Sequence, residues 1–301
     1  MKKKVISMLL AAMMTASLVG GSVMTAAAEE AGEKQLSVQV GPNPETIDPA
    51  LNSAVDGGNM LLHAFEGLLA MDKDGNLIPG QAESWETSED GLTWTFHLRE
   101  GLKWSDGTDL TANDFVYTWQ RVCDPELAAP YSETVLGMVE GYDAAMEGDT
   151  TALGVTAVDD LTLEVKLANP CTYFGYLAAF ATLYPVQQAT VEANGEAWAV
   201  DASTYVCNGP FYITEWVPDS HIIMSKNPNY WNADAIKLDS IKWNLIEDMN
   251  AAYSAYQNGD VQFIKSVPTE EIPSLRENPE FHVTWVPTMF PSTIRSSRLT
   301  M

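Results

Sequence analysis

The sequence predicts a mixed α/β fold, and two patterns along its 301 residues support that prediction. Short apolar or alternating runs, typical of strands, recur along the chain, and segments with helical periodicity lie between them. Hydrophobic residues make up 46% of the chain and charged residues 19%, which supplies enough apolar side chain for a large core. Strands and helices of these lengths favour an α/β or α+β arrangement of about two domains.

Six segments are predicted as strands. The clearest is 93–98, where Trp94, Phe96 and Leu98 alternate with polar residues and therefore share one face of the strand. The other predicted strands are 36–40, 161–167, 212–216, 222–225 and 241–246.

Two helices are predicted from their ends and their apolar faces. Residues 111–123 begin with Thr111 and Asp114, a pair typical of a helix N-terminus, and their apolar residues recur on one face. Residues 249–258 follow Asp248, whose charge suits a helix N-terminus, and stop at Gly259, a natural C-cap.

The first 28 residues are predicted to be a secretory signal peptide. Three lysines at positions 2–4 precede an apolar stretch, and the run from Thr25 to Ala28 supplies an Ala-x-Ala cleavage site. An uncleaved anchor is the alternative, which the alanine content and the cleavage site disfavour. No Cys ends the segment, so we expect an exported protein without a lipid anchor, either periplasmic or at the cell surface or extracellular.

The charge of the chain excludes one class of partner. Asp and Glu number 41 against 16 Lys and Arg, which gives a formal net charge of −25. Nucleic-acid binding needs a basic surface that neutralises phosphates, and the few cations are scattered among carboxylates. We therefore expect no nucleic-acid partner.

No arrangement of residues predicts catalysis, a cofactor or a metal. The cysteines Cys123, Cys171 and Cys207 show no C-x-x-C spacing, so we expect small buried hydrophobes, with one incidental disulfide as the alternative. The four histidines stand singly and are predicted to be surface or packing residues. Residues 72–76 begin like a calcium loop but lack its later ligands, so a turn is predicted there, as it is at 105–108. We therefore predict no enzyme, cofactor or metal site.

Several segments together resemble the bacterial oligopeptide-binding proteins, the substrate-binding subunits of peptide ABC importers in solute-binding protein family 5. The longest match is WTFHLREGLKWSDGT at 94–108, followed by LTANDFVYTWQR at 110–121. Four more occur in the order of the family: ETIDP at 45–49, FEGLL at 65–69, NGPF at 208–211 and NPNYW at 227–231.

The resemblance implies a periplasmic-binding-protein-like type II (cluster C) α/β fold. Such a protein is a two-lobed clamp that holds an extended peptide mainly through the peptide backbone, as an added strand. On this basis residues 29–66 and 190–288 form lobe I, and 67–189 form an inserted subdomain II. The implied partners are short peptides and the membrane permease of an ABC importer, with the protein acting as a monomer.

The resemblance also implies the peptide-binding residues. Asn52, Ser53, Ala54 and Val55 fall on the family's strand that pairs with the ligand backbone, and Tyr131 falls on a tyrosine that touches the ligand. Ile264, Lys265 and Ser266 align with another ligand-facing segment. Ser53 stands where the best-known members have an acidic residue, and Lys265 where they have an amide. The alternatives are that Ser53 is simply a strand residue and that Lys265 is a solvent-facing lysine.

The end of the sequence departs from the family. Residues 289–301 contain no Asp or Glu and are unlike the family at this position. Relatives continue for a comparable length into a second ligand-gripping lobe, so we expect a C-terminally truncated or frameshifted chain that lacks that lobe and binds peptides weakly or not at all.

Three alternatives to a peptide receptor remain. The first is a receptor of the same family for dipeptides, nickel chelates or sugars, although the W-S-D-G-T and Y-T-W-Q-R segments favour oligopeptides. The second is an exported chaperone-like module that binds unfolded chains. The third is an exported hydrolase, which needs a poised carboxylate pair or a nucleophile that nothing in the sequence singles out.

Overall fold

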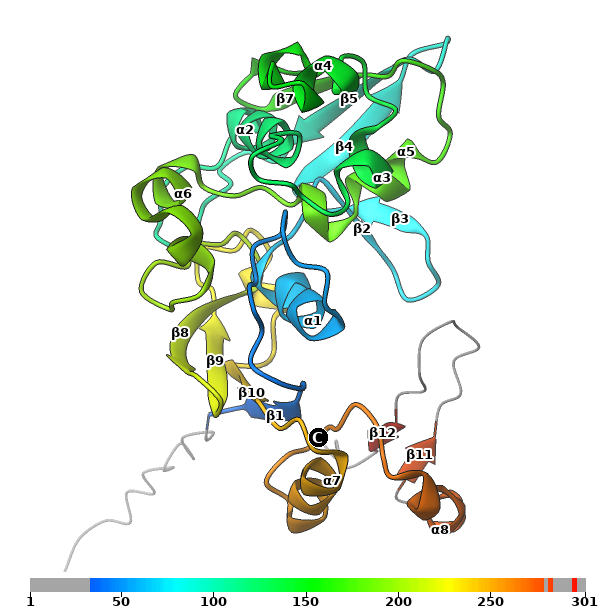
Figure 1. The fold of residues 1–301 in the computed structure, drawn as a ribbon, viewed down its shortest axis with the longest axis vertical. Helices are drawn as coiled ribbons and strands as arrows, with labels where there is room; N and C mark the ends of the chain where they lie inside the picture. Colours follow the sequence, from blue (N-terminus) through cyan, green and yellow to red (C-terminus); the bar gives the residue numbers. More distant parts are fainter. Residues whose placement is uncertain (1–32, 279–280, 284–293, 297–301) are drawn as a thin grey trace, which may run out of the picture. The chain divides into compact units, whose positions relative to one another are not determined.

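Two four-stranded sheets organise this computed structural model, which describes residues 33–278, 281–283 and 294–296 (Figure 1). The β1 sheet has the order β1-β10-β9-β8, with β1 Gln35–Gln39, β10 Ser240–Asn244, β9 His221–Lys226 and β8 Phe211–Val217. In it β1 runs parallel to β10, and the other neighbours are antiparallel. The β5 sheet is antiparallel throughout, in the order β4-β5-β7-β6, with β4 Ala82–Thr87, β5 Thr93–Leu98, β7 Thr162–Lys166 and β6 Val155–Asp159.

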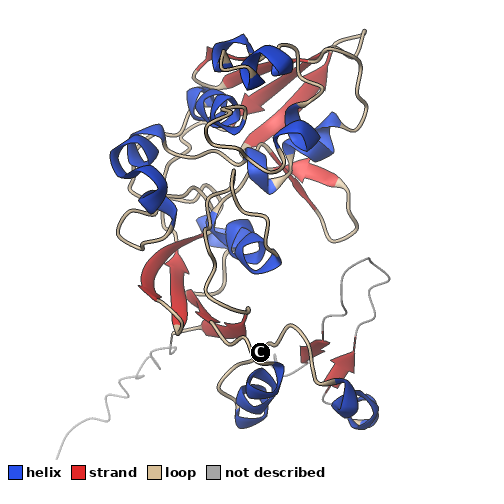
Figure 2. Cartoon of the chain, in the orientation of Figure 1, coloured by secondary structure: helices blue, strands red, loops and turns tan. Residues whose placement is uncertain are grey.

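Helices accompany both sheets, which confirms the mixed class (Figure 2). Helix α1, Val55–Ala64, packs on β8, and helix α2, Ala112–Val122, packs on β6 and β7. The other α-helices are α3 Ser132–Leu136, α4 Tyr142–Met146, α5 Phe174–Ala178, α6 Gln188–Asn194, α7 Met249–Asn258 and α8 Ile272–Glu277. The short 3-10 helices are η1 Thr150–Ala152, η2 Ala181–Leu183, η3 Gly195–Ala199, η4 Ala233–Ala235 and η5 Thr269–Glu271. Two small antiparallel pairs complete the described elements: β2 Leu69–Met71 with β3 Leu77–Pro79, and β11 Phe281–Val283 with β12 Ile294–Ser296.

The strand and the two helices that were predicted from the strongest sequence patterns, at 93–98, 111–123 and 249–258, are present in the structure. Strand β5 alternates half-buried and buried residues, with Trp94, Phe96 and Leu98 inside. At the start of α2 the carboxylate of Asp114 accepts the backbone N–H of Thr111 at 2.8 Å. The predicted bounds of α7 are confirmed, because Asp248 accepts the Ala251 N–H at 2.8 Å and Gly259 ends the helix in the left-handed region, at φ +83°.

The segment Asn52–Val55 is not a strand, so that expectation is wrong. The carbonyl of Asp48 accepts the backbone N–H groups of Leu51 and Asn52, which closes a turn, and helix α1 begins at Val55. The side chain of Asn52 lies against Gly57, where a Cβ atom would come within 2.1 Å of its amide oxygen. The chain therefore folds back into a helix here and cannot extend into a sheet.

The described side chains form two hydrophobic clusters. The large one extends from Val38 to Leu245 and includes apolar residues of both sheets. The small one contains Ala252, Tyr253, Val261, Ile264, Val267 and Leu275. The three cysteines are buried and unpaired, which confirms that they act as small core residues. Among the described residues, no helix is long and apolar enough to cross a membrane.

Two predicted segments fall wholly or mostly beyond this description. The signal peptide at 1–28 lies outside the described residues. Of the atypical tail at 289–301, only the backbone of β12 is described.

Candidate functional site

Tyr131 lies at the N-terminus of α3 and packs against a second aromatic ring. Its ring centroid is 5.5 Å from that of Phe180, with the ring planes at 68°, which is a favourable edge-to-face geometry. Phe180 is 42% exposed and directly precedes η2. The pair therefore presents a preorganised aromatic surface to solvent.

The loop before α1 exposes backbone that a ligand can use. Ser53 and Ala54 are exposed, and the side chain of Asn52 donates to the carbonyl of Ala54 at 3.0 Å. Within the described part of the chain, no hydrogen bond involves Ser53. Its N–H and C=O are thus open to pairing with an extended chain, although the loop is not itself a strand.

The segment Ile264–Ser266 lies beside β1 and is held there by one amide side chain. Gln39 on β1 accepts the backbone N–H of Lys265 at 3.0 Å and donates to the carbonyl of Ile246 at 2.8 Å. Ile264 is buried in the small cluster, while Lys265 and Ser266 are half-buried. The side chain of Ile264 therefore belongs to the core, and only the backbone of this residue can face a ligand.

Two of the three predicted binding segments directly precede helices that share a neighbour. The 3-10 helix η2 contacts both α1, which begins at Val55, and α3, which follows Tyr131. The segment Ile264–Ser266 makes its backbone contacts with β1 instead. The structure therefore packs the helices that follow the first two segments against the same short helix, η2, and anchors the third segment on the β1 sheet.

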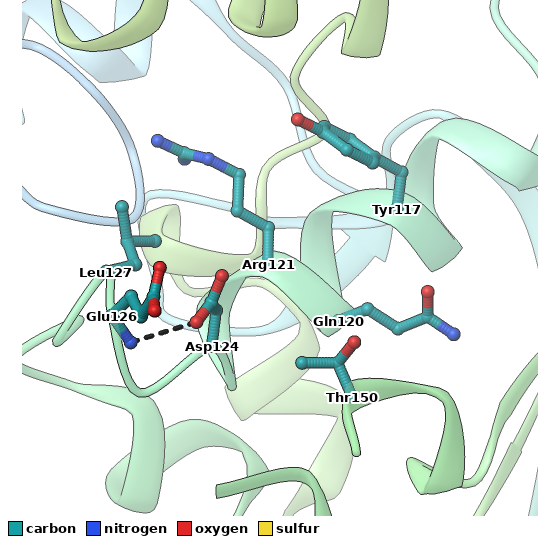
Figure 3. Close-up of a pocket in the computed structure, with 7 residues that line it drawn as sticks. All are labelled: Tyr117, Gln120, Arg121, Asp124, Glu126, Leu127 and Thr150. Atoms are coloured by element: carbon teal, nitrogen blue, oxygen red, sulfur yellow. Dashed lines mark hydrogen bonds between the residues drawn. The ribbon is translucent and has the colours of Figure 1, made fainter. Parts of the chain in front are cut away.

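A pocket of about 490 Å³ lies beside the C-terminal half of α2 (Figure 3). Tyr117, Gln120 and Arg121 of α2 line it, together with Asp124, Glu126, Leu127 and Thr150. None of the predicted peptide-binding residues belongs to it. The Arg121 guanidinium is already paired with Asp48, so this pocket offers no free cation for a ligand carboxylate.

Glu66, in the segment between α1 and β2, receives hydrogen bonds from three side chains. Its carboxylate accepts from Gln81 Nε2 at 2.7 Å, Tyr230 Oη at 2.7 Å and Trp231 Nε1 at 2.6 Å. The guanidinium carbon of Arg99 lies 3.7 Å from the centroid of the Trp231 ring, a cation–π contact. Burial raises the pKa of Glu66, and the three hydrogen bonds and the charge of Arg99 only partly oppose that rise.

Asp48, in the segment between β1 and α1, is paired with a cation. Arg121 donates to its two oxygens at 3.1 and 2.6 Å, and Trp198 Nε1 donates at 3.2 Å. The backbone N–H of Ala50 adds a fourth hydrogen bond at 2.9 Å. The buried carboxylate is therefore fully compensated.

The groups considered for chemistry take structural roles. Residues 33–278 and the two short described strands bring together no set of His, Cys, Asp or Glu that could hold a metal ion. His63 packs against Trp243 at 5.1 Å between ring centroids, and burial lowers its pKa. His97 lies 3.8 Å from Glu86, His221 bonds Glu215 at 3.0 Å, and the side chain of His282 lies outside the described residues. Asp72 closes the turn between β2 and β3, as predicted for 72–76.

Sequence reasoning missed Phe180 and Gln39, which position Tyr131 and Lys265. Phe180 lies in a small-residue apolar run, and Gln39 is one of three polar residues in the five-residue strand β1, so neither carries a local signal. Asp48 and Glu66 do lie in two of the segments that carried the family resemblance, ETIDP and FEGLL.

Comparisons with known proteins agree with this architecture. The family model described as bacterial extracellular solute-binding proteins, family 5 Middle, matches residues 76–297. The periplasmic oligopeptide-binding protein OppA of Escherichia coli is 38% identical over 286 residues, which cover 91% of this chain and 52% of OppA. The probable deoxycholate-binding periplasmic protein YgiS of E. coli is 36% identical, over 78% of this chain and 44% of YgiS.

The fold of this chain also resembles that of a solved relative. Haemophilus influenzae OppA in complex with RPPGFSPFR superimposes with a TM-score of 0.79 and 35% identity, over 84% of this chain and 50% of that one. The chain thus spans about half the length of the relatives it matches.

Proposed function

Because this chain belongs to the family 5 bacterial extracellular solute-binding proteins, we propose that it captures short peptides outside the cytoplasmic membrane and delivers them to an ABC importer. In this role it binds and releases its ligand without catalysis. It acts as an exported monomer, and its partner is the membrane permease of the importer.

One observation carries this proposal: the match to OppA covers 91% of the chain at 38% identity. The superposition on Haemophilus influenzae OppA in its complex with RPPGFSPFR supports the same ligand class. Backbone hydrogen bonds serve any peptide sequence, so a receptor built on them accepts many peptides.

The proposed contacts follow from the exposed groups of the candidate site. The unpaired backbone of Ser53 pairs with the peptide backbone, and Tyr131 packs against a peptide side chain. Lys265 and Ser266 supply the further ligand-facing segment, held in place by Gln39. The proposed division is lobe I at 29–66 and 190–288, with an inserted subdomain II at 67–189.

A second candidate ligand class comes from the similarity to YgiS, a probable deoxycholate-binding periplasmic protein. An amphipathic steroid would use the exposed aromatic surface of Tyr131 and Phe180 in place of the open backbone at Ser53. Replacing the aromatic rings therefore weakens steroid binding most, whereas peptide binding also depends on the backbone groups.

Isothermal titration of the chain without residues 1–28 tests the proposal. The ligands are pools of tripeptides, tetrapeptides and pentapeptides, and deoxycholate in a separate arm. A second sample joins this chain to the C-terminal half of E. coli OppA, since the chain matches about half of that protein. Peptide binding by either sample supports the proposal. Deoxycholate binding alone supports the second candidate, and the absence of binding by both samples overturns the assignment.

A further inference from the structure

Two acidic residues flank helix α1 in the sequence, and the side chain of each connects the β1 sheet to the β5 sheet. Asp48 precedes the helix and Glu66 follows it. The helix belongs with the β1 sheet, because it packs on β8 and its Ala64 carbonyl accepts the N–H of Gly209 at 2.8 Å, just before β8. Each carboxylate therefore extends from the β1-sheet side of the molecule.

Glu66 connects the two sides through side chains from each. Gln81 belongs to the β5-sheet side, because it directly precedes β4 and its carbonyl accepts the N–H of Arg99 at 3.0 Å. Tyr230 and Trp231 belong to the β1-sheet side, because they follow β9 in a loop that Asn227 ties to the Gly209 carbonyl at 2.9 Å. One carboxylate thus holds donors from both sides.

Arg99 strengthens this first connection without bonding the carboxylate. It follows β5 and donates from Nε to the Gly80 carbonyl at 2.8 Å, which fixes it on the β5-sheet side. Its guanidinium stacks on Trp231, whose N–H is the donor to Glu66. The cation–π contact therefore crosses the same junction.

Asp48 makes the second connection. Its partner Arg121 lies on α2, which packs on β6 and β7, so this ion pair also runs from the segment before α1 to the β5-sheet side. Trp198 bonds the same carboxylate and stacks on Tyr205 with ring centroids 5.5 Å apart. Tyr205 in turn packs edge-to-face on Phe65, the neighbour of Glu66, at 5.7 Å. A continuous aromatic cluster therefore separates the two connections.

We propose that Asp48 and Glu66 form a two-point lock that holds the β5 sheet and the β1 sheet as one rigid body. A single point of attachment would leave rotation about that point, whereas two points leave only rotation about the line between them. The hydrogen bonds of Ser105 with Cys207 and Asn229, at 2.8–3.2 Å, oppose that remaining rotation. The aromatic cluster between the points fills the space into which the sheets would otherwise tilt. The side-chain hydrogen bonds of the lock involve no predicted peptide-binding residue, and only the backbone carbonyl of Asp48 bonds one, Asn52, so the lock can be tested independently of the proposed function.

Distance measurements between the two sheets test the lock in the absence of any ligand. Spin labels are placed on Glu89→Cys, in the turn between β4 and β5, and on Ser220→Cys, in the turn between β8 and β9, both exposed. The three native cysteines are buried, so the chain without introduced cysteines serves as the labelling control. Double electron–electron resonance then gives the distribution of inter-sheet distances.

Two substitutions each weaken one point while leaving both carboxylates in place. Gln81→Met removes the β5-sheet donor to Glu66, and Arg121→Lys replaces the two-bonded pairing with Asp48 by a single ammonium contact. The control is Gln188→Met, which makes the same substitution at an exposed site and removes an amide hydrogen bond to Glu192 within α6. We expect a broader distance distribution for each of the first two variants, a larger broadening for the double variant than the two single effects add up to, and no change for Gln188→Met.

The decisive comparison is between Gln81→Met and Gln188→Met, because Gln81→Met leaves the Glu66 carboxylate its hydrogen bonds from Tyr230 and Trp231. If circular dichroism shows that Arg121→Lys does not fold, the comparison of the two methionine variants alone tests the lock. Equal distance distributions for the two methionine variants overturn the lock. A broadening confined to Gln81→Met supports it.

Discussion

Arg121 and Asp48, which lie 73 residues apart in the sequence, form an ion pair in which only 12% and 3% of the side chains are exposed. Each carboxylate oxygen of Asp48 accepts a hydrogen bond from a different guanidinium nitrogen of Arg121. This bidentate geometry compensates best for the hydration that both charges lose on burial. Neither partner can be removed without leaving the other charge largely buried and without its counter-ion.

Arg121→Ala is expected to lower the free energy of unfolding by about 3–5 kcal/mol, because it leaves the buried Asp48 carboxylate without its cation. Urea unfolding of the full chain measures the change. Lys73→Ala is the control, since Lys73 pairs with Asp74 on an exposed turn and its loss should cost less than about 0.5 kcal/mol. Equal effects of the two substitutions would contradict the assigned role of the pair.

Glu66 gives the stability a defined pH dependence. Its pKa is raised in the folded protein, so the folded state binds the proton more tightly than the unfolded state does. The stabilisation from this group is therefore complete below its unfolded pKa, about 4.3, and declines as the pH rises from there through the higher folded pKa.

Glu66→Gln isolates this contribution because the amide does not titrate. We expect the unfolding free energy of the parent, relative to Glu66→Gln, to fall as the pH rises across that window. Urea unfolding of both proteins at several pH values measures the difference. A difference that stays constant or increases with pH would show that the folded protein does not raise this pKa.

Gly209→Ala should destabilise the fold by about 1–3 kcal/mol, as overpacking does. A Cβ atom at Gly209 would come within 2.6 Å of the backbone of Ala64 and Phe65, which cannot move without shifting the end of α1. Gly58→Ala is the matched control inside α1, where the nearest atom is 3.6 Å away. Thermal unfolding should show this control slightly stabilised, by about 0.5–1 kcal/mol, because Ala is the better helix former.

The three thiols should not react while the protein is folded. Burial raises the pKa of Cys123 to about 11 and that of Cys207 to about 12, so neither forms the reactive thiolate near neutral pH. A thiol-specific chromogenic reagent should detect all three cysteines in denaturant and none in buffer at pH 8. Rapid labelling of the native chain would mean that a cysteine is accessible.

Peptide affinity should depend on the aromatic pair of Tyr131 and Phe180. Tyr131→Ala and Phe180→Ala are each expected to weaken binding about tenfold, roughly 1.4 kcal/mol, in the chain or the completed chimera, whichever binds. Tyr131→Phe keeps the ring and should retain most of the affinity. If Tyr131→Phe and Tyr131→Ala lose the same affinity, the hydroxyl and not the ring makes the contact.

Local patterns predicted those elements whose signals lie within a few residues. Helix α7 has its cap at Asp248 and its stop at Gly259, and β5 shows its two faces directly in the alternation of residues 93–98. Helix α1 was missed because Gly57 and Gly58, both poor helix formers, lie in its first turns. The family resemblance then placed a strand where Asp48 turns the chain into that helix.

The junction between the sheets could not be predicted from local sequence. Glu66 meets Tyr230 and Trp231 across 164 and 165 positions, and no pattern within a short window reports such a distance. The resemblance did select the segments that meet there, since Asp48, Glu66 and Trp231 all lie in family-like motifs. Those motifs hold the scaffold together, whereas the proposed ligand contacts at Ser53 and Lys265 lie outside them.

The parallel pairing of β1 with β10 sets the order in which the protein can fold. Gln35 pairs with Ser240, 205 positions further along the chain, whereas β8, β9 and β10 are sequence neighbours that can associate as they are made. Closing so long a loop is slow, because its entropy is lost before the strand contacts form. The first described strand is therefore among the last to join its sheet, because a growing chain cannot pair β1 until β10, at Ser240–Asn244, has been synthesised.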